Sequence, residues 1–79
     1  MKPIYVVEDD TNIREIELFA LKNCGYDTKG FERASDFWQG LKSQQPALVL
    51  LDLMLPDEDG LAVLRKLRES RETRDLPII

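Results

Sequence analysis

Along the chain, short runs of apolar residues alternate with segments in which apolar residues recur at helical spacing. Ile4–Val7 and Leu48–Leu51 are apolar at every position, which is typical of strands that are covered on both faces of a sheet. Tyr26–Phe31 is more polar, which favours an edge strand. Between these runs, apolar residues recur at helical spacing. The pattern therefore predicts alternating strands and helices, and hence right-handed βαβ units around a parallel sheet.

The first expected helix has signals at both of its ends. It begins at Asn12, where Asn12 and Glu15 resemble a capping box, and Gly25 suits its C-cap. Its expected inner stripe contains Ile13, Ile16, Ala20 and Cys24, with Leu21 beside it. We expect the cysteine on this stripe to be a small buried side chain.

Two further helices follow the same pattern. Ser35 is the expected cap of the second helix and Asp59 that of the third. The apolar residues at helical spacing are Phe37, Trp38 and Leu41 in the second helix and Leu61, Leu64 and Leu67 in the third. Leu76–Ile79 begins a further strand. With the two apolar strands adjacent and the edge strand outside, we predict an α/β fold with strand order 2-1-3 and flanking helices.

Composition restricts the class of protein. The 79 residues suffice for one small domain, and 43% hydrophobic with 33% charged residues is typical of a globular protein rather than a disordered one. No apolar run approaches the ~20 residues of a membrane helix. The N-terminal Met1-Lys2-Pro3 leads into a strand without the apolar core of a signal peptide. We therefore expect a cytoplasmic protein with no membrane segment.

The titratable residues narrow the chemistry further. The chain has no histidine and a single cysteine, so zinc-type ligation is effectively excluded and no internal disulfide can form. The net charge of −4 argues against a nucleic-acid surface on this segment, because such surfaces carry clustered lysine and arginine. Oxygen ligands from acidic residues remain as the candidates.

Acidic residues follow both of the fully apolar strands. Glu8, Asp9 and Asp10 come directly after the first, and Asp52 comes directly after the second. If the two strands are parallel neighbours, their carboxyl ends lie side by side, at the edge where open α/β sheets bind ligands. Carboxylates gathered there repel one another unless a hard cation such as Mg²⁺ lies between them. The sequence therefore predicts a metal site with a candidate nucleophile.

Three segments together resemble a known family: Val6–Asp10, Leu50–Pro56 and Asp59-Gly60. In this order and spacing they are similar to the receiver domain of bacterial two-component response regulators, which has a flavodoxin-like fold. The similarity runs over the whole chain. It implies a phosphoacceptor signalling module rather than an enzyme. By position, Asp52 is the implied acceptor of a phosphoryl group from a histidine kinase.

The same resemblance implies a magnesium site. By position, Glu8 and Asp9 form the implied acidic pair, and Asp52 and the backbone carbonyl of Met54 are the further ligands. The chemistry of the residues agrees, because Mg²⁺ takes oxygen ligands and usually keeps several waters. A carboxylate oxygen can also attack phosphorus to form an aspartyl-phosphate.

The remaining acidic residues have simpler interpretations. We interpret Asp10 as an exposed loop carboxylate near the start of the first helix, where the helix dipole favours negative charge. Asp57 and Glu58 are interpreted as parts of a solvated loop. None of these three is expected to bind the metal.

The resemblance also implies groups that this chain does not contain. A complete receiver resembles a five-stranded doubly wound domain, with a serine or threonine after the fourth strand and a lysine after the fifth. Both positions would follow Ile79, so we interpret residues 1–79 as the N-terminal fragment of a receiver and expect impaired phosphorylation. Any DNA binding by the parent protein would need a further domain. The outer edge of Leu48–Leu51 would also be unpaired, which favours a homodimer or higher oligomer.

Two other hypotheses stay open. A phosphatase-type enzyme also forms an aspartyl-phosphate, but it requires an Asp-x-Asp pair at the end of the first strand, and Glu8-Asp9-Asp10 lacks that spacing. An inert assembly fragment, which oligomerises through exposed strand edges, would bind no metal. Metal titration separates this hypothesis from the phosphoacceptor. The sequence specifies neither the cognate kinase nor the output domain.

Overall fold

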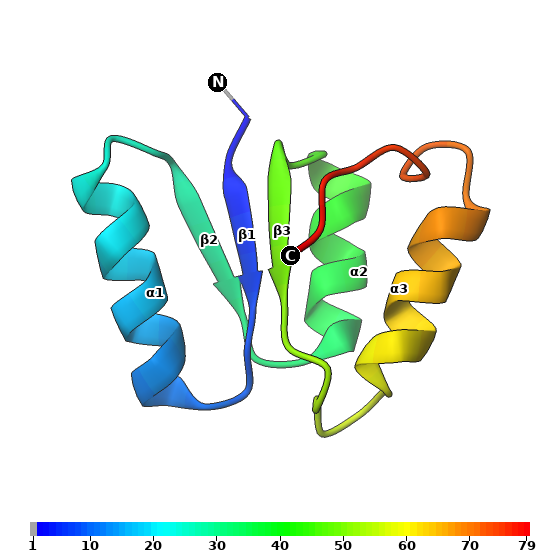
Figure 1. Ribbon diagram of the computed structural model, residues 1–79, viewed down its shortest axis with the longest axis horizontal. Coiled ribbons are helices and arrows are strands. Elements are labelled where there is room, and N and C mark those ends of the chain that lie inside the picture. The colour runs from blue at the N-terminus through cyan, green and yellow to red at the C-terminus, as the bar shows by residue number, and fades with distance from the viewer. Residues whose placement is uncertain (1) are drawn as a thin grey trace.

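The computed structural model describes residues 2–79, in which strands and helices alternate along the chain (Figure 1). The elements are β1 (Ile4–Val7), α1 (Thr11–Asn23), β2 (Thr28–Phe31), α2 (Ala34–Ser43), β3 (Leu48–Leu51) and α3 (Gly60–Glu69). The three strands are parallel in the order β2-β1-β3, which confirms the predicted order. Ile4 of β1 lies opposite Thr28 on one side and Leu48 on the other, so the strands are in step.

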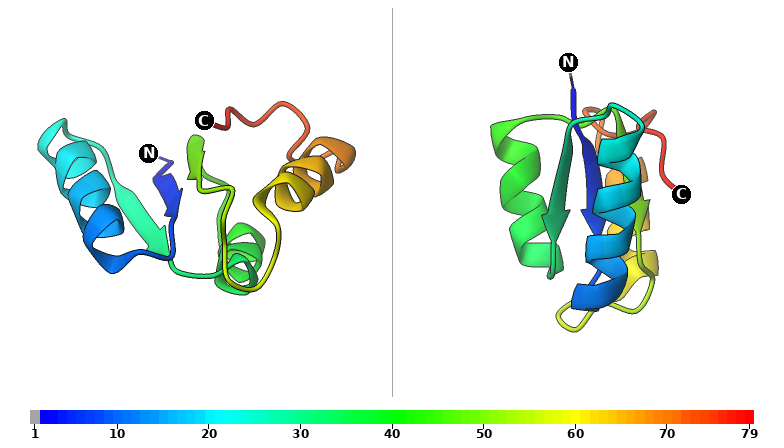
Figure 2. Two further views of the ribbon diagram at one scale, coloured as in Figure 1. Left: turned by 60° about the horizontal axis from the view of Figure 1, so that its bottom comes forward. Right: turned by 90° about the vertical axis from the view of Figure 1, so that its left-hand side faces the viewer.

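Helices cover both faces of this sheet, with α1 and α2 on opposite sides (Figure 2). The main core lies on the face covered by α2 and α3. Its buried residues are Tyr5, Val7, Phe31, Ala34, Phe37, Leu41, Val49, Val63 and Leu67. The central strand β1 is buried at all four positions, as its continuous apolar run predicts.

An aromatic group anchors α2 against the sheet. The ring of Tyr5 meets that of Phe31 edge to face, with 4.9 Å between centroids, and Phe37 packs edge-on against both. The Tyr5 hydroxyl lies 2.6 Å from the Gln44 carbonyl oxygen and 3.1 Å from that of Gly40. This buried side chain therefore fixes the carboxyl end of α2 as well as filling the core.

Both ends of α1 have side-chain or backbone caps. The expected Asn12–Glu15 capping box is wrong: Asp10 is the N-cap, and its Oδ1 accepts a hydrogen bond from the Ile13 amide at 3.0 Å. At the other end Gly25 has φ of 90°, in the left-handed region, as its expected capping role requires. The Gly25 and Tyr26 amides donate to the carbonyls of Lys22 and Leu21, which is a Schellman ending.

The face of α1 that was expected to be buried is exposed. Ile13 and Ile16 are 48% and 68% exposed, and Cys24 is exposed rather than a buried small residue. The half-buried residues are instead Arg14, Glu17, Leu18 and Leu21. Apolar spacing could not predict this face, because two of its four members are charged.

The fourth strand begins along β3, as the sequence suggests, but the edge of β3 is not left free. The amides of Val49 and Leu51 donate to the carbonyls of Pro77 and Ile79 at 3.0 and 2.9 Å, and the Ile79 amide donates back to Val49. The expected unpaired edge on β3 is therefore wrong. β2 is also shorter than expected, because Tyr26 and Asp27 precede it. Among residues 2–79, no helix is both long and apolar enough to cross a membrane.

Candidate metal centre

Three carboxylates meet where β1 and β3 end. Glu8 follows β1 directly, Asp9 follows Glu8, and Asp52 follows β3. One carboxylate oxygen from each of the three lies within 4.8 Å of the others. The convergence expected from the sequence is therefore present in the structure.

The sheet register produces this convergence. Val7 and Leu51, the last residues of β1 and β3, lie opposite each other. The pairing continues one step further, because the Asp52 amide donates to the Val7 carbonyl at 2.9 Å and the Glu8 amide to the Phe31 carbonyl at 3.0 Å. The backbone of Glu8 and of Asp52 is thus held by the ladder, so loop conformation alone does not determine where these two carboxylates lie.

The site raises the proton affinity of one of its carboxyls. Burial raises the pKa of Glu8, and the neighbouring Asp52 and Asp9 carboxyls raise it as well. The hydrogen bond from the Asp10 amide acts in the opposite direction and lowers this pKa. That amide lies 3.2 Å from Glu8 Oε2. Repulsion between the acidic groups was expected from the sequence. The partial burial of Glu8 is the larger cause.

The loop after β3 folds back tightly on itself. The Met54 amide donates to Asp52 Oδ1 at 3.1 Å, and Met54 forms an isolated antiparallel bridge with Asp59. The Gly60 amide donates to the Leu53 carbonyl at 3.0 Å. A Cβ at Gly60 would lie 2.3 Å from Leu53 Cα, so this position accepts no side chain without moving the loop. The glycine therefore belongs to the geometry that presents Asp52 and Met54.

The three acidic residues at the end of this loop each bind a helix. Asp59 is the N-cap of α3, as expected, with its Oδ1 3.0 Å from the Leu61 amide. Asp57 is not merely solvated: its two oxygens accept hydrogen bonds from the Ala34 and Ser35 amides of α2 at 2.9 and 3.0 Å. These bonds lower the pKa of Asp57. The predicted cap of α2, Ser35, is wrong, because Asp57 caps this helix from outside it.

Glu58 also departs from the solvated loop that we expected. It accepts a hydrogen bond from Trp38 Nε1 at 2.9 Å and forms an ion pair with Lys66. The Lys66 ammonium lies 5.9 Å from the centre of the Trp38 ring. Hydrogen bonds from Lys66 and Trp38 lower the pKa of Glu58. The loop is thus joined to both α2 and α3.

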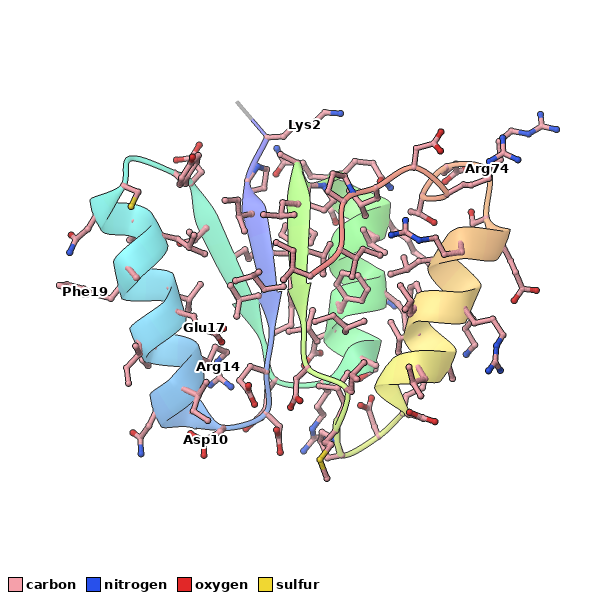
Figure 3. All side chains as sticks on the ribbon, viewed as in Figure 1. Lys2, Asp10, Arg14, Glu17, Phe19 and Arg74 are labelled. Atoms are coloured by element: carbon pink, nitrogen blue, oxygen red, sulfur yellow. The ribbon has the colours of Figure 1, made fainter. Side chains whose placement is uncertain are left out.

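Sequence reasoning missed one residue that shapes the site from α1. Arg14 Nη1 donates to the backbone carbonyl of Glu8 at 2.8 Å, so the turn that presents Glu8 and Asp9 is held from the helix side. Figure 3 shows Arg14 directed toward the end of β1, while Phe19 points away from the sheet. Glu17 of the same helix lines a hollow of about 160 Å³ together with Glu8 and Asp52. The only sequence signal for these roles is the position of Arg14 and Glu17, four and seven residues after Asp10.

The donor set fits a small hard cation. Three carboxylates bring negative charge and only oxygen ligands, which suits Mg²⁺ and not a metal that prefers nitrogen or sulfur. Glu8 and Asp52 are half-buried and Asp9 is exposed, so water can complete the coordination. Met54, 81% exposed and two residues after Asp52, could add its carbonyl from the loop.

Comparison with known proteins gives consistent results. Residues 4–79 match the family described as "Response regulator receiver domain". The chain is 37% identical over 78 residues to the transcriptional regulatory protein GltR of Pseudomonas aeruginosa, and 38% identical over 76 residues to the DNA-binding transcriptional regulator NtrC of Proteus hauseri. These matches cover 99% and 96% of this chain but 32% and 16% of those proteins.

Solved structures with the same fold include receiver proteins. The N-terminal domain of a response regulator receiver protein from Methanoculleus marisnigri superposes with a TM-score of 0.90 at 29% identity, and the match covers 99% of this chain and 63% of that one. The bacteriophytochrome response regulator AtBRR superposes with a TM-score of 0.89 at 32% identity, over all of this chain and 64% of that one. The described fold thus corresponds to about two thirds of these two structures.

Proposed function

Because this chain belongs to the response regulator receiver domain family, we propose that it is a phosphoacceptor module that takes a phosphoryl group from a histidine kinase onto Asp52. The observation that supports this most directly is the convergence of Glu8, Asp9 and Asp52 within 4.8 Å at the carboxyl edge of the sheet. On this proposal, the ends of two adjacent parallel strands bring the nucleophile and two metal ligands together.

Glu8, Asp9, Asp52 and the Met54 carbonyl are the proposed ligands of Mg²⁺. When bound, Mg²⁺ would offset part of the negative charge of the three carboxylates and of the transferred phosphoryl group. The protein's own contribution is to position these groups. The strand ladder fixes Glu8 and Asp52, and the hydrogen bond from Met54 to Asp52 Oδ1 orients the acceptor carboxylate.

In the proposed step, an oxygen of the Asp52 carboxylate attacks phosphorus. A new P–O bond forms to Asp52 while the bond from phosphorus to the donor atom breaks, and the donor leaves with that electron pair. With a histidine donor the leaving group is the imidazole, and with an acyl phosphate it is a carboxylate. The reaction needs little acid–base chemistry, so positioning and charge neutralisation supply most of the catalysis.

Metal dependence of labelling tests the proposal. The chain is incubated with acetyl phosphate, with Mg²⁺ or with EDTA, and followed by intact mass. We expect one phosphoryl group to be added with Mg²⁺ and none with EDTA. Equal labelling under the two conditions would contradict the metal role, and no labelling with Mg²⁺ over many hours would contradict the acceptor role.

The curated relatives also suggest what the phosphorylated module controls. The relatives GltR and NtrC are named as transcriptional regulators, and the matched region spans a third or less of each. We propose that this module, like those relatives, regulates transcription, and that its phosphorylation state is read by other segments of a longer protein. The net charge of −4 argues against direct DNA contact by this segment, so we propose that another segment of the longer protein makes that contact.

The 79-residue chain is also expected to associate with itself. The outer face of α1 exposes Ile16 and Phe19 at 68% each, with Ile13 beside them at 48%, and exposed apolar surface of this kind favours association. Size-exclusion chromatography with light scattering should show a mass above the monomer as concentration rises. Replacing Phe19→Lys should return the chain to monomer mass, while Leu53→Lys, on a half-exposed residue of the loop after β3, should not. A monomer at all concentrations would contradict this expectation.

A further inference from the structure

The first residues of the loop after β3 receive little support from packing. Leu53 is 50% exposed and Met54 is 81% exposed, although this loop carries the acceptor at its start and a proposed metal ligand at Met54. Leu55 packs against the core, and the conformation of the two exposed residues before it depends on hydrogen bonds. Among the side-chain hydrogen bonds that this loop makes within residues 2–79, those of Asp57 join the most distant positions, 22 and 23 residues apart in the sequence.

The first amides of α2 need a hydrogen-bond acceptor that the N-cap of this helix does not supply. The N-cap of α2 is Arg33, which makes no capping hydrogen bond with its side chain. The first amides of a helix need an acceptor. Both oxygens of Asp57 supply one, so this carboxylate joins the loop after β3 to the first amides of α2. Glu58 makes a second link from the loop to α2, through Trp38 one turn further along the helix.

This tether lies beside the metal site. A hollow of about 490 Å³ is lined by Asp9, Pro56 and Asp57, together with Glu32 and Arg33. Asp57 thus lies on the same side of the molecule as the carboxylate of Asp9, which follows β1, and three residues after Met54. Movement of the loop away from α2 would carry Met54 with it.

We propose that Asp57 is a positioning residue for the metal centre: by holding the β3–α3 loop against the start of α2, it keeps the Met54 carbonyl and the Asp52 carboxylate where Glu8 and Asp9 can share one Mg²⁺ with them. The inference rests on the proposed function. Asp57 does not touch the ion in this account. It acts through the loop, in the way that outer-shell partners fix the ligands of other metal sites.

The first test is the Mg²⁺ affinity of Asp57→Ala. Titration calorimetry should give an affinity about 10-fold or more below that of the native chain, because loss of an outer-shell partner commonly costs 10–100-fold. The matched control is Asp36→Ala, which removes the same charge from the exposed first turn of α2 without touching the tether. Its affinity should stay within about twofold of native.

A second variant separates positioning from helix stability. Asp57→Ala also removes the cap of α2, so a weaker site could reflect a frayed or unfolded helix. Residue 33 has the extended backbone of an N-cap, with φ of −132° and ψ of 154°, so Arg33→Ser can cap the helix from within. The double variant Arg33→Ser, Asp57→Ala restores a cap and leaves the net charge unchanged, but it does not restore the tether.

The Mg²⁺ affinities and stabilities of these variants separate a positioning role of Asp57 from its capping of α2. We expect the double variant to regain native circular dichroism and thermal stability while its Mg²⁺ affinity remains about as low as that of Asp57→Ala, and Arg33→Ser alone to bind like the native chain. Asp57→Asn, which keeps one acceptor oxygen, should be intermediate. Native affinity in the double variant, or in a folded Asp57→Ala, would overturn the positioning role alone. Absence of Mg²⁺ binding by the native chain would overturn the proposed function and the inference with it.

Discussion

Replacing Asp52→Asn is expected to abolish phosphorylation. An amide cannot supply the carboxylate oxygen that attacks phosphorus, whereas the fold should persist, because Asp52 is half-buried and its amide keeps its bond to Val7. Loss of one charge-stabilising donor commonly costs about 10²–10³ in rate, and loss of the nucleophile should cost more than that. Intact mass after incubation with acetyl phosphate and Mg²⁺ is the measurement.

The control for this substitution is Asp36→Asn, which removes an exposed carboxylate from the first turn of α2 and should be labelled like the native chain. Labelling that survives in Asp52→Asn would place the acceptor elsewhere, with Asp9 the first residue to examine. Mapping of the modified peptide would then identify it.

Labelling of the native 79-residue chain is itself expected to be slow. Within residues 2–79 the one ion pair joins Lys66 to Glu58, so no cationic side chain is paired with Asp52. Without a fixed cation at the acceptor, Mg²⁺ alone neutralises the charge that develops on the phosphoryl oxygens. Rapid stoichiometric labelling would show that the metal suffices.

Much of the fold could be predicted from the sequence, because its signals are local. The uninterrupted apolar runs at Ile4–Val7 and Leu48–Leu51 identify central strands, and parallel strands with helical connections leave few possible orders. Once β1 and β3 are neighbours, the residues that follow them must meet at one edge. Glu8, Asp9 and Asp52 therefore converge, as expected. Asp59 and Gly25 could also be predicted, since each caps the helix next to it.

The features that sequence reasoning missed depend on contacts between distant positions. Ser35 is a reasonable local cap for α2, but the acceptor is Asp57, 22 residues later along the chain. Likewise, apolar spacing on α1 favoured an inner face with Ile13 and Ile16, while the structure places Arg14 there. A charged side chain can face a sheet when it finds a partner, here the Glu8 carbonyl, and no periodicity reports that partner.

These distant contacts also change the interpretation of the acidic residues in the loop after β3. Asp57, Glu58 and Asp59 form an acidic run that looks like solvated surface in the sequence. In the structure each accepts a hydrogen bond from a helix, so the run connects the acceptor loop to α2 and α3. Charge in this segment is therefore structural, and substitutions there are expected to affect the metal site without removing a ligand.

The second large effect is expected for Asp9→Ala, which should lower the Mg²⁺ affinity by at least about 100-fold. Outer-shell partners alone contribute about 10–100-fold, and Asp9 is a proposed ligand in the carboxylate cluster. The matched control is Asp10→Ser, which removes the same charge one residue later but keeps a side chain that can cap α1. Comparing the Mg²⁺ affinities of the two variants by calorimetry separates direct binding of the ion by Asp9 from the effect of losing one negative charge in the turn. A similar loss in both would mean that Mg²⁺ responds to the summed charge of the turn, and native affinity in Asp9→Ala would remove this residue from the site.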